Sequence, residues 1–217
     1  MITKADLNLF TQYKHLENLT KKHKTFIAFD TETTGTNSRT DKILEIGAYK
    51  ISFDRNSPYY ENPQIFDMLI NPEIEIPNFI SQLTGITNEM ISGAENAKNV
   101  ISEFLKFIGE DSVLIAHNAP FDLYFIDNQL EKMYIKPIKN LCVDTLPLSR
   151  WAFPEFASES QKGNYTLQNL AKKLNIQVNA AHRAYDDAKV CMELFKKIYF
   201  SHAEPLQGQL ELIFETP

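Results

Sequence analysis

Three segments near the start of the chain have the pattern of consecutive β-strands, and they constrain the fold more than any other feature. They are rich in β-branched and aromatic residues and cover residues 25–30 (TFIAFD), 43–53 (ILEIGAYKISF) and 65–70 (IFDMLI). The first two are joined by TTGTNSRTDK, whose Gly, Asn and Ser residues are typical of a turn. We therefore predict an antiparallel meander of three strands.

Helical and strand patterns alternate after this meander. Apolar residues recur at helical spacing over residues 95–108, 118–133, 166–174 and 184–200. Short apolar runs typical of buried strands occupy residues 113–117 (VLIAH) and 141–144. Antiparallel strands followed by alternating helices and short strands predict an α/β fold, in which a mixed sheet is flanked by helices.

The two ends of the chain differ from this central part, which we place at residues 25–200. In residues 1–24, apolar residues spaced by three or four predict an amphipathic helical extension: Leu7, Phe10, Tyr13, Leu16 and Leu19. At the other end, Pro205 cannot continue the last helix. Residues 201–217 are therefore interpreted as a tail.

Composition limits the kind of protein this can be. The chain has 217 residues, 43% of them hydrophobic, which is enough for one core without disulfides. Cys142 and Cys191 lie outside any metal-binding pattern, and no apolar run is long enough for a membrane span or a signal peptide. We expect a cytoplasmic protein with no membrane partner. The net charge of −6 disfavours a broad basic surface for nucleic acid, but phosphates can also be held through divalent cations.

Acidic residues cluster at three places. Asp30 and Glu32 flank Thr31 at the end of the first strand, so both carboxylates point to the same face. Asp122 falls one turn into the helix after VLIAHN, and residues 182–188 (HRAYDDA) open the last long helix. Each feature alone has a structural explanation, as a polar strand end, a helix-start acid stabilised by the helix dipole, or a capping region. Two carboxylates side by side, however, repel each other unless a cation joins them.

The three clusters form an ordered set of motifs. FIAFDTETTG, LIAHNAPFD and AHRAYDDA resemble, in this order, the three motifs of the DEDDh, or DnaQ-like, family of 3′-to-5′ exonucleases. LEIGAYKI and LTGIT, which lie between the first and second motifs, extend the resemblance to about residues 25–200. The resemblance implies a ribonuclease H-like fold and the release of nucleoside 5′-monophosphates from a 3′ end.

The family's functional residues fall on five positions. Asp30 and Glu32 resemble the first pair of metal ligands, Asp122 the third and Asp187 the fourth, and His182 resembles the general base. An imidazole can take a proton from water at neutral pH. Four carboxylates can hold two divalent ions about 3.5 to 4 Å apart, and oxygen ligands favour Mg²⁺ or Mn²⁺ over zinc.

The last acid is ambiguous from chemistry alone, because Asp186 and Asp187 are neighbours and either could be a ligand. The family's spacing, a His followed by four residues and then Asp-Ala, selects Asp187. Another branch of the superfamily carries a Tyr four residues before this Asp, but here that position is Arg183. The resemblance therefore implies the histidine variant of the site.

Substrate contacts are also implied by the resemblance. In the family, residues after the first motif and in the LTGIT-like segment hold the terminal nucleotide, which gives these candidates: Thr33, Gly35, Leu83, Thr84 and Phe121. Leu83 and Phe121 could equally be core residues. Asn118 could contact a sugar or phosphate, or it could cap the helix that carries Asp122.

The tail contains a second motif. Residues 209–214 (QLELIF) resemble the QLxLxF peptide with which bacterial replication proteins bind the sliding clamp. In an extended strand, Leu210, Leu212 and Phe214 would project to one side as anchors for a groove, with Gln209 available for hydrogen bonds. The alternative is a C-terminal strand that packs these residues onto the chain's own domain.

The two resemblances thus imply an exonuclease that acts on single-stranded DNA 3′ ends and proofreads for a bacterial replicative polymerase. Its expected partners are the sliding clamp and a DNA polymerase catalytic subunit. An RNA-trimming exonuclease of the same family is one alternative, because the five site residues do not show whether a 2′-hydroxyl is tolerated. A replication adaptor with an idle site is the alternative from another class, and the intact set of five residues disfavours it.

Overall fold

The predicted meander forms the centre of the sheet. Strands β2 (Thr25–Thr33), β3 (Ile43–Ser52) and β4 (Gln64–Asn71) pair antiparallel, with Phe29 opposite Ala48 and Ala48 opposite Phe66. The sequence prediction of three consecutive strands is therefore confirmed.

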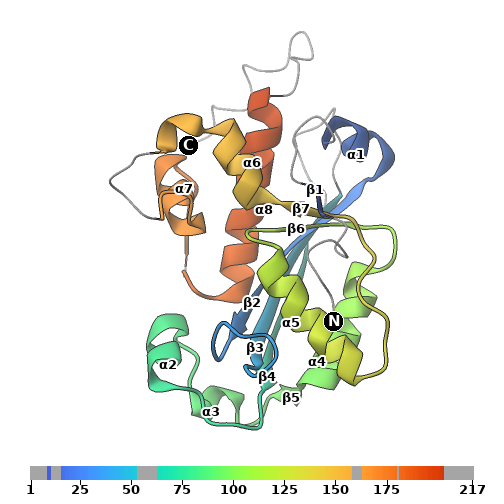
Figure 1. Ribbon diagram of the computed structural model, residues 1–217, viewed down its shortest axis with the longest axis vertical. Helices are drawn as coiled ribbons and strands as arrows, with labels where there is room; N and C mark the ends of the chain where they lie inside the picture. The colour runs from blue at the N-terminus through green and yellow to red at the C-terminus, as the bar shows by residue number, and fades with distance from the viewer. Residues whose placement is uncertain (1–8, 11–15, 53–62, 158–162, 180, 203–217) are drawn as a thin grey trace.

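The computed structural model describes residues 9–10, 16–52, 63–157, 163–179 and 181–202 (Figure 1). Four shorter strands complete the sheet in this part of the chain: β1 (Leu9–Phe10), β5 (Glu95–Asn96), β6 (Val113–Ala116) and β7 (Cys142–Asp144). The strand order is β1-β7-β6-β2-β3-β4-β5, and β6 and β7 run parallel to β2. The mixed α/β sheet expected from the sequence is confirmed.

Helices cover both faces of this sheet (Figure 1). They are α1 (Leu16–Lys22), α2 (Asn78–Thr84), α3 (Asn88–Ile91), α4 (Ala97–Ile108), α5 (Pro120–Lys132), α6 (Thr145–Ala152), α7 (Leu167–Lys173) and α8 (Ala184–His202), with a 3₁₀ turn at Pro154–Phe156. The four helices predicted after the meander are α4, α5, α7 and α8. None of the helices in the described ranges is long and apolar enough to cross a membrane.

The alternation of side chains along β2 divides the interior into two cores. Phe26 and Ala28 face α8 and its neighbours, and the ring of Phe26 stacks on Phe195 with centroids 5.7 Å apart. Ile27 and Phe29 face the opposite layer, which is formed by α4 and α5. A strand that is buried on both faces explains the nearly continuous apolar run TFIAF.

The N-terminal extension differs from its prediction. Within the described residues, a helix covers only Leu16–Lys22, whereas Leu9 and Phe10 form β1 and pair in parallel with Cys142 and Val143 of β7. The helical prediction for Leu9–Phe10 was wrong because the open edge of β7 offers unpaired backbone groups that a short strand can satisfy. Leu16 and Leu19 are buried in the same core as α8.

Helix α6 has no counterpart in the sequence prediction. Asp144 caps it by accepting a hydrogen bond from the amide of Leu146 at 3.1 Å. Pro147 lies in the first turn, where backbone N–H groups have no acceptor within the helix, so the N–H that proline lacks costs no hydrogen bond. A proline that usually marks a break is thus compatible with a helix at this position.

Helix α8 lies very close to the meander at one point. A Cβ atom at Gly47 of β3 would overlap the backbone of Ala184 and Tyr185, in the first turn of α8. Only glycine leaves room for this approach. It brings the N-terminal turn of α8 over β3, beside the end of β2.

Candidate active site

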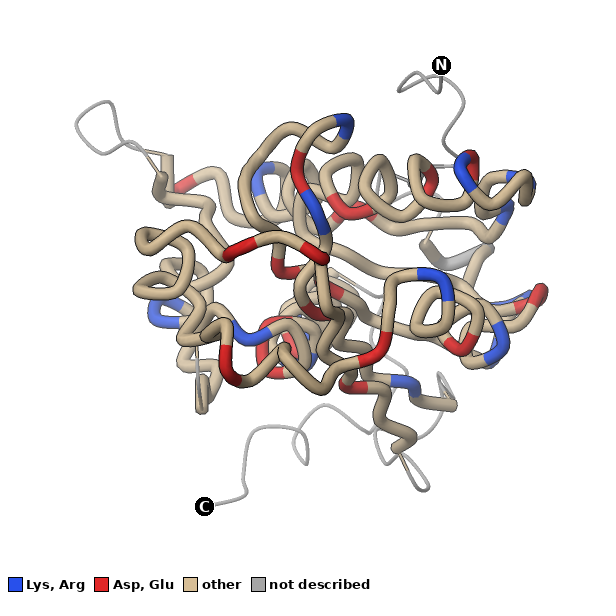
Figure 2. The backbone as a smooth tube through the Cα atoms, turned by 90° about the horizontal axis from the view of Figure 1, so that it is seen from below, with Lys and Arg blue, Asp and Glu red and all other residues tan. Residues whose placement is uncertain are grey.

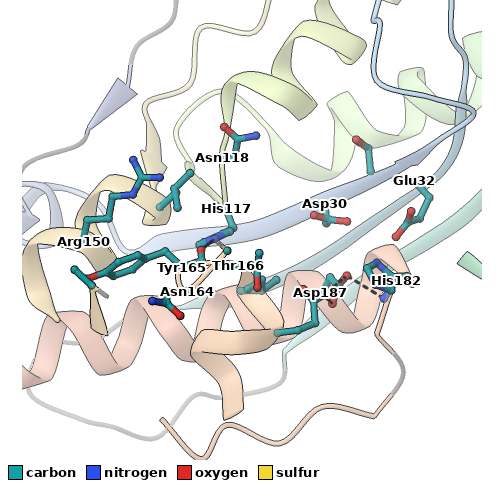
Figure 3. A pocket seen from close by; sticks show the side chains of 16 residues that line it. Asp30, Glu32, His117, Asn118, Arg150, Asn164, Tyr165, Thr166, His182 and Asp187 are labelled. Carbon is teal, nitrogen blue, oxygen red and sulfur yellow. Dashed lines mark hydrogen bonds between the residues drawn. The ribbon is translucent and has the colours of Figure 1, made fainter. Parts of the chain in front are cut away.

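Asp30 and Glu32 of β2 line an open pocket of about 820 Å³. Their side chains point toward the first turn of α8, which supplies Asp187, and toward His182 just before that helix (Figure 3). Figure 2 shows Asp and Glu residues on many elements of the chain, and the pocket takes its acids from β2 and α8, which are far apart in sequence. We call the part of the pocket around these four residues the acidic end.

The acidic end contains a tight triangle of possible ligands. Glu32, His182 and Asp187 each offer one ligand atom, and these atoms lie within 4.8 Å of one another. Asp30 stands beside this group in the same pocket. The structure therefore brings together four of the five residues that the sequence singled out.

The fifth residue, Asp122, lies next to the group but behind the wall of the pocket. It is 2% exposed, and its Oδ1 accepts hydrogen bonds from the amide and the hydroxyl of Thr31, at 3.0 and 2.7 Å. Asp122 is close enough to Asp30 that its charge raises the pKa of that acid. Helix α5 thus attaches its acid to β2 between the two acids of the strand.

Asp187 is held in place from two sides, which separates it from its neighbour. Its Oδ2 accepts the amide of His182 at 3.1 Å, and Gln168 of α7 donates to both carboxylate oxygens, at 3.1 and 3.2 Å. Asp186 does not line the pocket, and its charge acts on Asp67, Arg183 and Tyr185 as well as on Asp187 itself. The geometry favours Asp187, as the family spacing does.

Burial and mutual repulsion make the acids of this site unusually weak. Burial is the largest cause in every case, and it raises the pKa of Glu32 to about 8 and that of Asp122 to about 7. The pKa values of Asp30 and Asp187 are also raised, for Asp30 by the charges of Asp122 and Asp187 after burial. Grouped carboxylates of this kind ionise readily only when a cation compensates them.

His182 has an uncommon backbone conformation. Its φ is 61°, in the left-handed region that residues with a side chain rarely occupy. The conformation turns the chain into α8 and lets the amide of His182 reach Asp187 in that helix's first turn. The imidazole then faces Glu32 across the pocket (Figure 3).

The other end of the pocket was not found by sequence reasoning. It is lined by His117, Arg150, Asn164 and Tyr165, and we call it the basic end because Arg150 is the one Lys or Arg among the lining residues in the described part of the chain. The Arg150 guanidinium carbon lies 6.0 Å from the centre of the Tyr165 ring. Figure 3 shows the two ends on opposite sides of the view.

His117 braces the basic end. Its Nε2 lies 2.8 Å from the carbonyl oxygen of Tyr165, and its Nδ1 lies 3.0 Å from the hydroxyl of Thr145. A carbonyl can only accept, so Nε2 carries the proton. Burial lowers the pKa of His117, which favours the neutral ring. The ring thereby joins the end of β6 to the segment before α7.

The predicted substrate contacts are scattered around the site. Asn118 lines the pocket, and the interpretation of its side chain as a helix cap was wrong, because the N-cap of α5 is Ala119 and no side chain caps that helix. Outside the pocket lining lie the other five: Thr33, Gly35, Leu83, Thr84 and Phe121.

Their surroundings differ. Thr33 and Gly35 form a tight turn, in which the hydroxyl of Thr33 donates to the Gly35 carbonyl at 2.6 Å. Thr84 is buried and donates to the carbonyl of Ile80, whereas Leu83 is 51% exposed on α2. Phe121 packs on the core beneath α5. The predicted clamp motif, residues 209–214, lies outside the described residues.

The family model of the RNase T exonucleases matches residues 27–195, which include the acidic end and the basic end. The chain belongs to this exonuclease family. Among its relatives, the DNA polymerase III subunit epsilon of Treponema pallidum (strain Nichols) is 39% identical over 183 residues, which are 84% of this chain and 80% of that protein.

Exonuclease domains within larger proteins are also similar. The PolC-type DNA polymerase III of Clostridium perfringens (strain 13 / Type A) is 39% identical over 79% of this chain, but that match covers only 11% of the polymerase. Among solved structures, Escherichia coli exonuclease I in complex with a dT13 oligonucleotide has a TM-score of 0.64 at 20% identity, over 81% of this chain and 41% of that one. Exonuclease X in complex with 5′ overhanging duplex DNA has a TM-score of 0.60 at 22% identity, over 83% and 94%. These two structures establish the shared ribonuclease H-like fold.

Proposed function

We propose that this exonuclease removes nucleotides from the 3′ end of DNA, releases nucleoside 5′-monophosphates, and proofreads for a bacterial replicative DNA polymerase. Similarity to a DNA polymerase III subunit epsilon along most of both chains supports the role in replication. The observation that carries the proposal is the acidic end itself, where Glu32, His182 and Asp187 converge beside Asp30 in an open pocket.

The acidic end fits divalent cations. Its carboxylates supply oxygen ligands, and burial followed by the charges of neighbouring acids raises the pKa values of Asp30 and Glu32, which a bound cation would counteract. Asp30, Glu32, Asp122 and Asp187 would hold two ions, for which Mg²⁺ or Mn²⁺ suits the oxygen-rich donor set. When bound, such ions activate a water molecule and neutralise charge on the phosphate and the leaving oxygen.

The chain's own residues would carry out the remaining steps. His182 lies at the edge of the acid cluster, where its imidazole would accept the proton of the attacking water and act as general base. Gln168 and the amide of His182 fix the Asp187 carboxylate, and Thr31 fixes that of Asp122, so the ligands are oriented before the substrate arrives. At the basic end, Arg150 would attract the backbone of the incoming strand.

The activity is tested with a 5′-labelled single-stranded DNA of mixed sequence. In Mg²⁺ the strand should shorten stepwise from its 3′ end, with nucleoside 5′-monophosphates as the product in chromatography. A circular strand of the same sequence has no 3′ end and should stay intact. Equal hydrolysis in EDTA, or cutting of the circle, would contradict the proposal.

The same assay separates the two alternatives. An RNA strand of identical sequence should be degraded more slowly than the DNA strand, and the reverse preference would favour the RNA-trimming function. No turnover on either strand in Mg²⁺ or Mn²⁺ would favour the idle adaptor.

We further propose that residues 209–214 bind a bacterial sliding clamp. The proposal rests on the sequence QLELIF, whose alternate residues Leu210, Leu212 and Phe214 suit three pockets of a groove that accepts an extended peptide, with Gln209 as a hydrogen-bonding residue. A chain truncated after Glu204 should hydrolyse free single-stranded DNA at the normal rate but lose its affinity for the clamp in calorimetric titration. The Leu212→Ala/Phe214→Ala variant should behave in the same way. Equal affinity of the intact and truncated chains would contradict this, and unfolding on truncation would favour docking of the tail on its own domain.

A further inference from the structure

An ion pair between the buried carboxylate of Glu45 and the partly exposed side chain of Arg183 lies beside the acidic end. Glu45 of β3 is opposite Glu32 in the sheet register and is 0% exposed. Arg183 donates to it through Nη2 at 2.6 Å and through Nε at 3.1 and 3.2 Å. A guanidinium that forks onto one carboxylate has a fixed orientation as well as a fixed position.

Glu45 holds the main chain as well as the side chain of this segment. Its Oε2 accepts the amide of Ala184 at 2.9 Å. The two residues that follow His182 are therefore both attached to one buried carboxylate of the central meander. The amide of His182 itself is attached to Asp187.

The segment before His182 contributes little to its placement. Residues 177–179 and 181 are exposed, so the chain approaches the site over the surface. The residues that hold this part of the chain in place are Arg183 and Ala184, which follow His182 and are hydrogen-bonded to Glu45. At Gly47, the absence of a side chain allows the same turn to rest on β3.

Stability alone is a weak explanation for this ion pair. The desolvation of the buried Glu45 carboxylate offsets much of its attraction to the partly exposed Arg183, and apolar replacements of such pairs are often as stable. The pair has a directional role that apolar residues could not have. Glu45 orients the Arg183 side chain and the Ala184 amide, which directly follow His182 with its left-handed backbone. Arg183 also lies near the charges of Asp67 and Asp186, so it is surrounded by acids on the side away from the pocket.

We propose that Glu45 and Arg183 are positioning residues for His182. They hold the turn at residues 183–184, and through it they keep the imidazole facing Glu32 and Asp187. The inference deepens the proposed function, since it rests on the assignment of His182 as general base.

A charge-neutral double variant, Glu45→Gln/Arg183→Met, tests the proposal. The glutamine can still accept the amide of Ala184. The charges of Glu45 and Arg183 act in opposite directions on Glu32 and disappear together, so the electrostatic environment of Glu32 changes little. The substrate is the p-nitrophenyl ester of thymidine 5′-monophosphate, a small diester that needs no strand binding, at saturating Mg²⁺. We expect kcat to fall about 10- to 100-fold, as for other residues that orient a catalytic group, with an unchanged KM and a nearly unchanged Tm. The matched control is the exposed pair of α4, Glu103→Gln/Lys106→Met, which should leave all three values unchanged.

The decisive comparison repeats the substitutions in a His182→Ala chain. If the ion pair acts through His182, the double variant has little further effect there. An equal fold-loss in both backgrounds would overturn the inference, and so would an unchanged kcat in the parent. If the double variant does not fold, the same comparison is made with Arg183→Lys, which keeps the positive charge but cannot form the hydrogen bonds from Nε and Nη2 together. Full activity of His182→Ala alone would refute the general base, which is a failure of the proposed function rather than of the anchoring.

Discussion

The two ends of the pocket are built in opposite ways. The carboxylates of the acidic end on β2 and α8, and that of Asp122 behind it, are buried or half-buried. Hydrogen bonds from Thr31, Gln168 and backbone amides fix those of Asp122 and Asp187. At the basic end, Arg150 is exposed, and its guanidinium carbon lies 6.0 Å from the centre of the Tyr165 ring. Bond cleavage requires atoms fixed in advance, whereas a strand that must slide after every cleavage requires contacts that release easily.

The largest expected effect comes from the acidic end. Asp187→Ala should lower kcat on the order of 10⁴-fold or more, because it removes a proposed metal ligand that Gln168 and the amide of His182 hold in place. Turnover of single-stranded DNA in Mg²⁺ is the measurement, with circular dichroism to show that the chain is folded. Asp186→Ala is the matched control one residue away and should retain most of the activity. If the control were the inactive variant, the assignment between the neighbours would be reversed.

His182→Ala should lower kcat about 10²- to 10⁴-fold while Mn²⁺ affinity is retained, since a general base is not needed to hold the ions. Calorimetric titration with Mn²⁺ and turnover on the same preparation separate the two properties. Added imidazole should restore part of the rate. A loss of metal affinity in proportion to the loss of rate would make His182 a ligand or a structural residue.

At the basic end, Arg150→Ala should raise KM for an oligonucleotide about fivefold and leave kcat unchanged, the effect of losing one exposed charge contact. The slope of log KM against log salt concentration should become shallower by about 1, as expected for the loss of one phosphate contact. The p-nitrophenyl ester should be hydrolysed normally. Lys172→Ala, an exposed cation of α7 outside the pocket lining, serves as the control. A fall in kcat on the small ester would mean that the two ends are not separate in function.

The smallest effect concerns stability in the absence of metal. The pKa of Glu32 is raised to about 8, so the folded chain binds a proton that the unfolded chain releases near its ordinary value of 4.5. The stability from this proton is complete below that ordinary value and is lost as pH rises toward 8. In EDTA, Glu32→Gln should therefore raise Tm by a few degrees at pH 8 and by less at pH 5. If the Tm difference between Glu32→Gln and the parent chain were the same at pH 5 and pH 8, the pKa of Glu32 would not be raised in the folded chain.

The same contrast explains what the sequence could predict. The acids and His182 lie in short motifs in which residue type and spacing carry the chemistry, and the structure brings them together. The basic end is assembled from His117, Arg150 and the segment at Asn164–Tyr165. Their residue types are ordinary, and their proximity depends on how α6 and α7 pack against α8. No local pattern encodes that packing.

Glu45 is an intermediate case. It interrupts the apolar strand ILEIGAYKI at a position that the register buries, and a charged residue at such a position requires a partner. The strand pattern could have indicated that a partner exists. It could not have indicated Arg183, which lies 138 residues further along the chain. The short strand β1 was missed for a related reason, because it depends on an edge that exists only in the folded sheet.

Helix α8 has a consequence for the order of folding. It supplies Asp187 and the turn with His182, and it also supplies much of the core against Phe26, so neither the core nor the acid cluster is complete before it docks. These contacts join residues about 160 positions apart in the chain, and contacts between such distant residues form late. During synthesis, the earlier strands leave the ribosome well before residues 184–202. A nascent chain would therefore carry Asp30 and Glu32 without a working nuclease, and activity would begin only with the last helix.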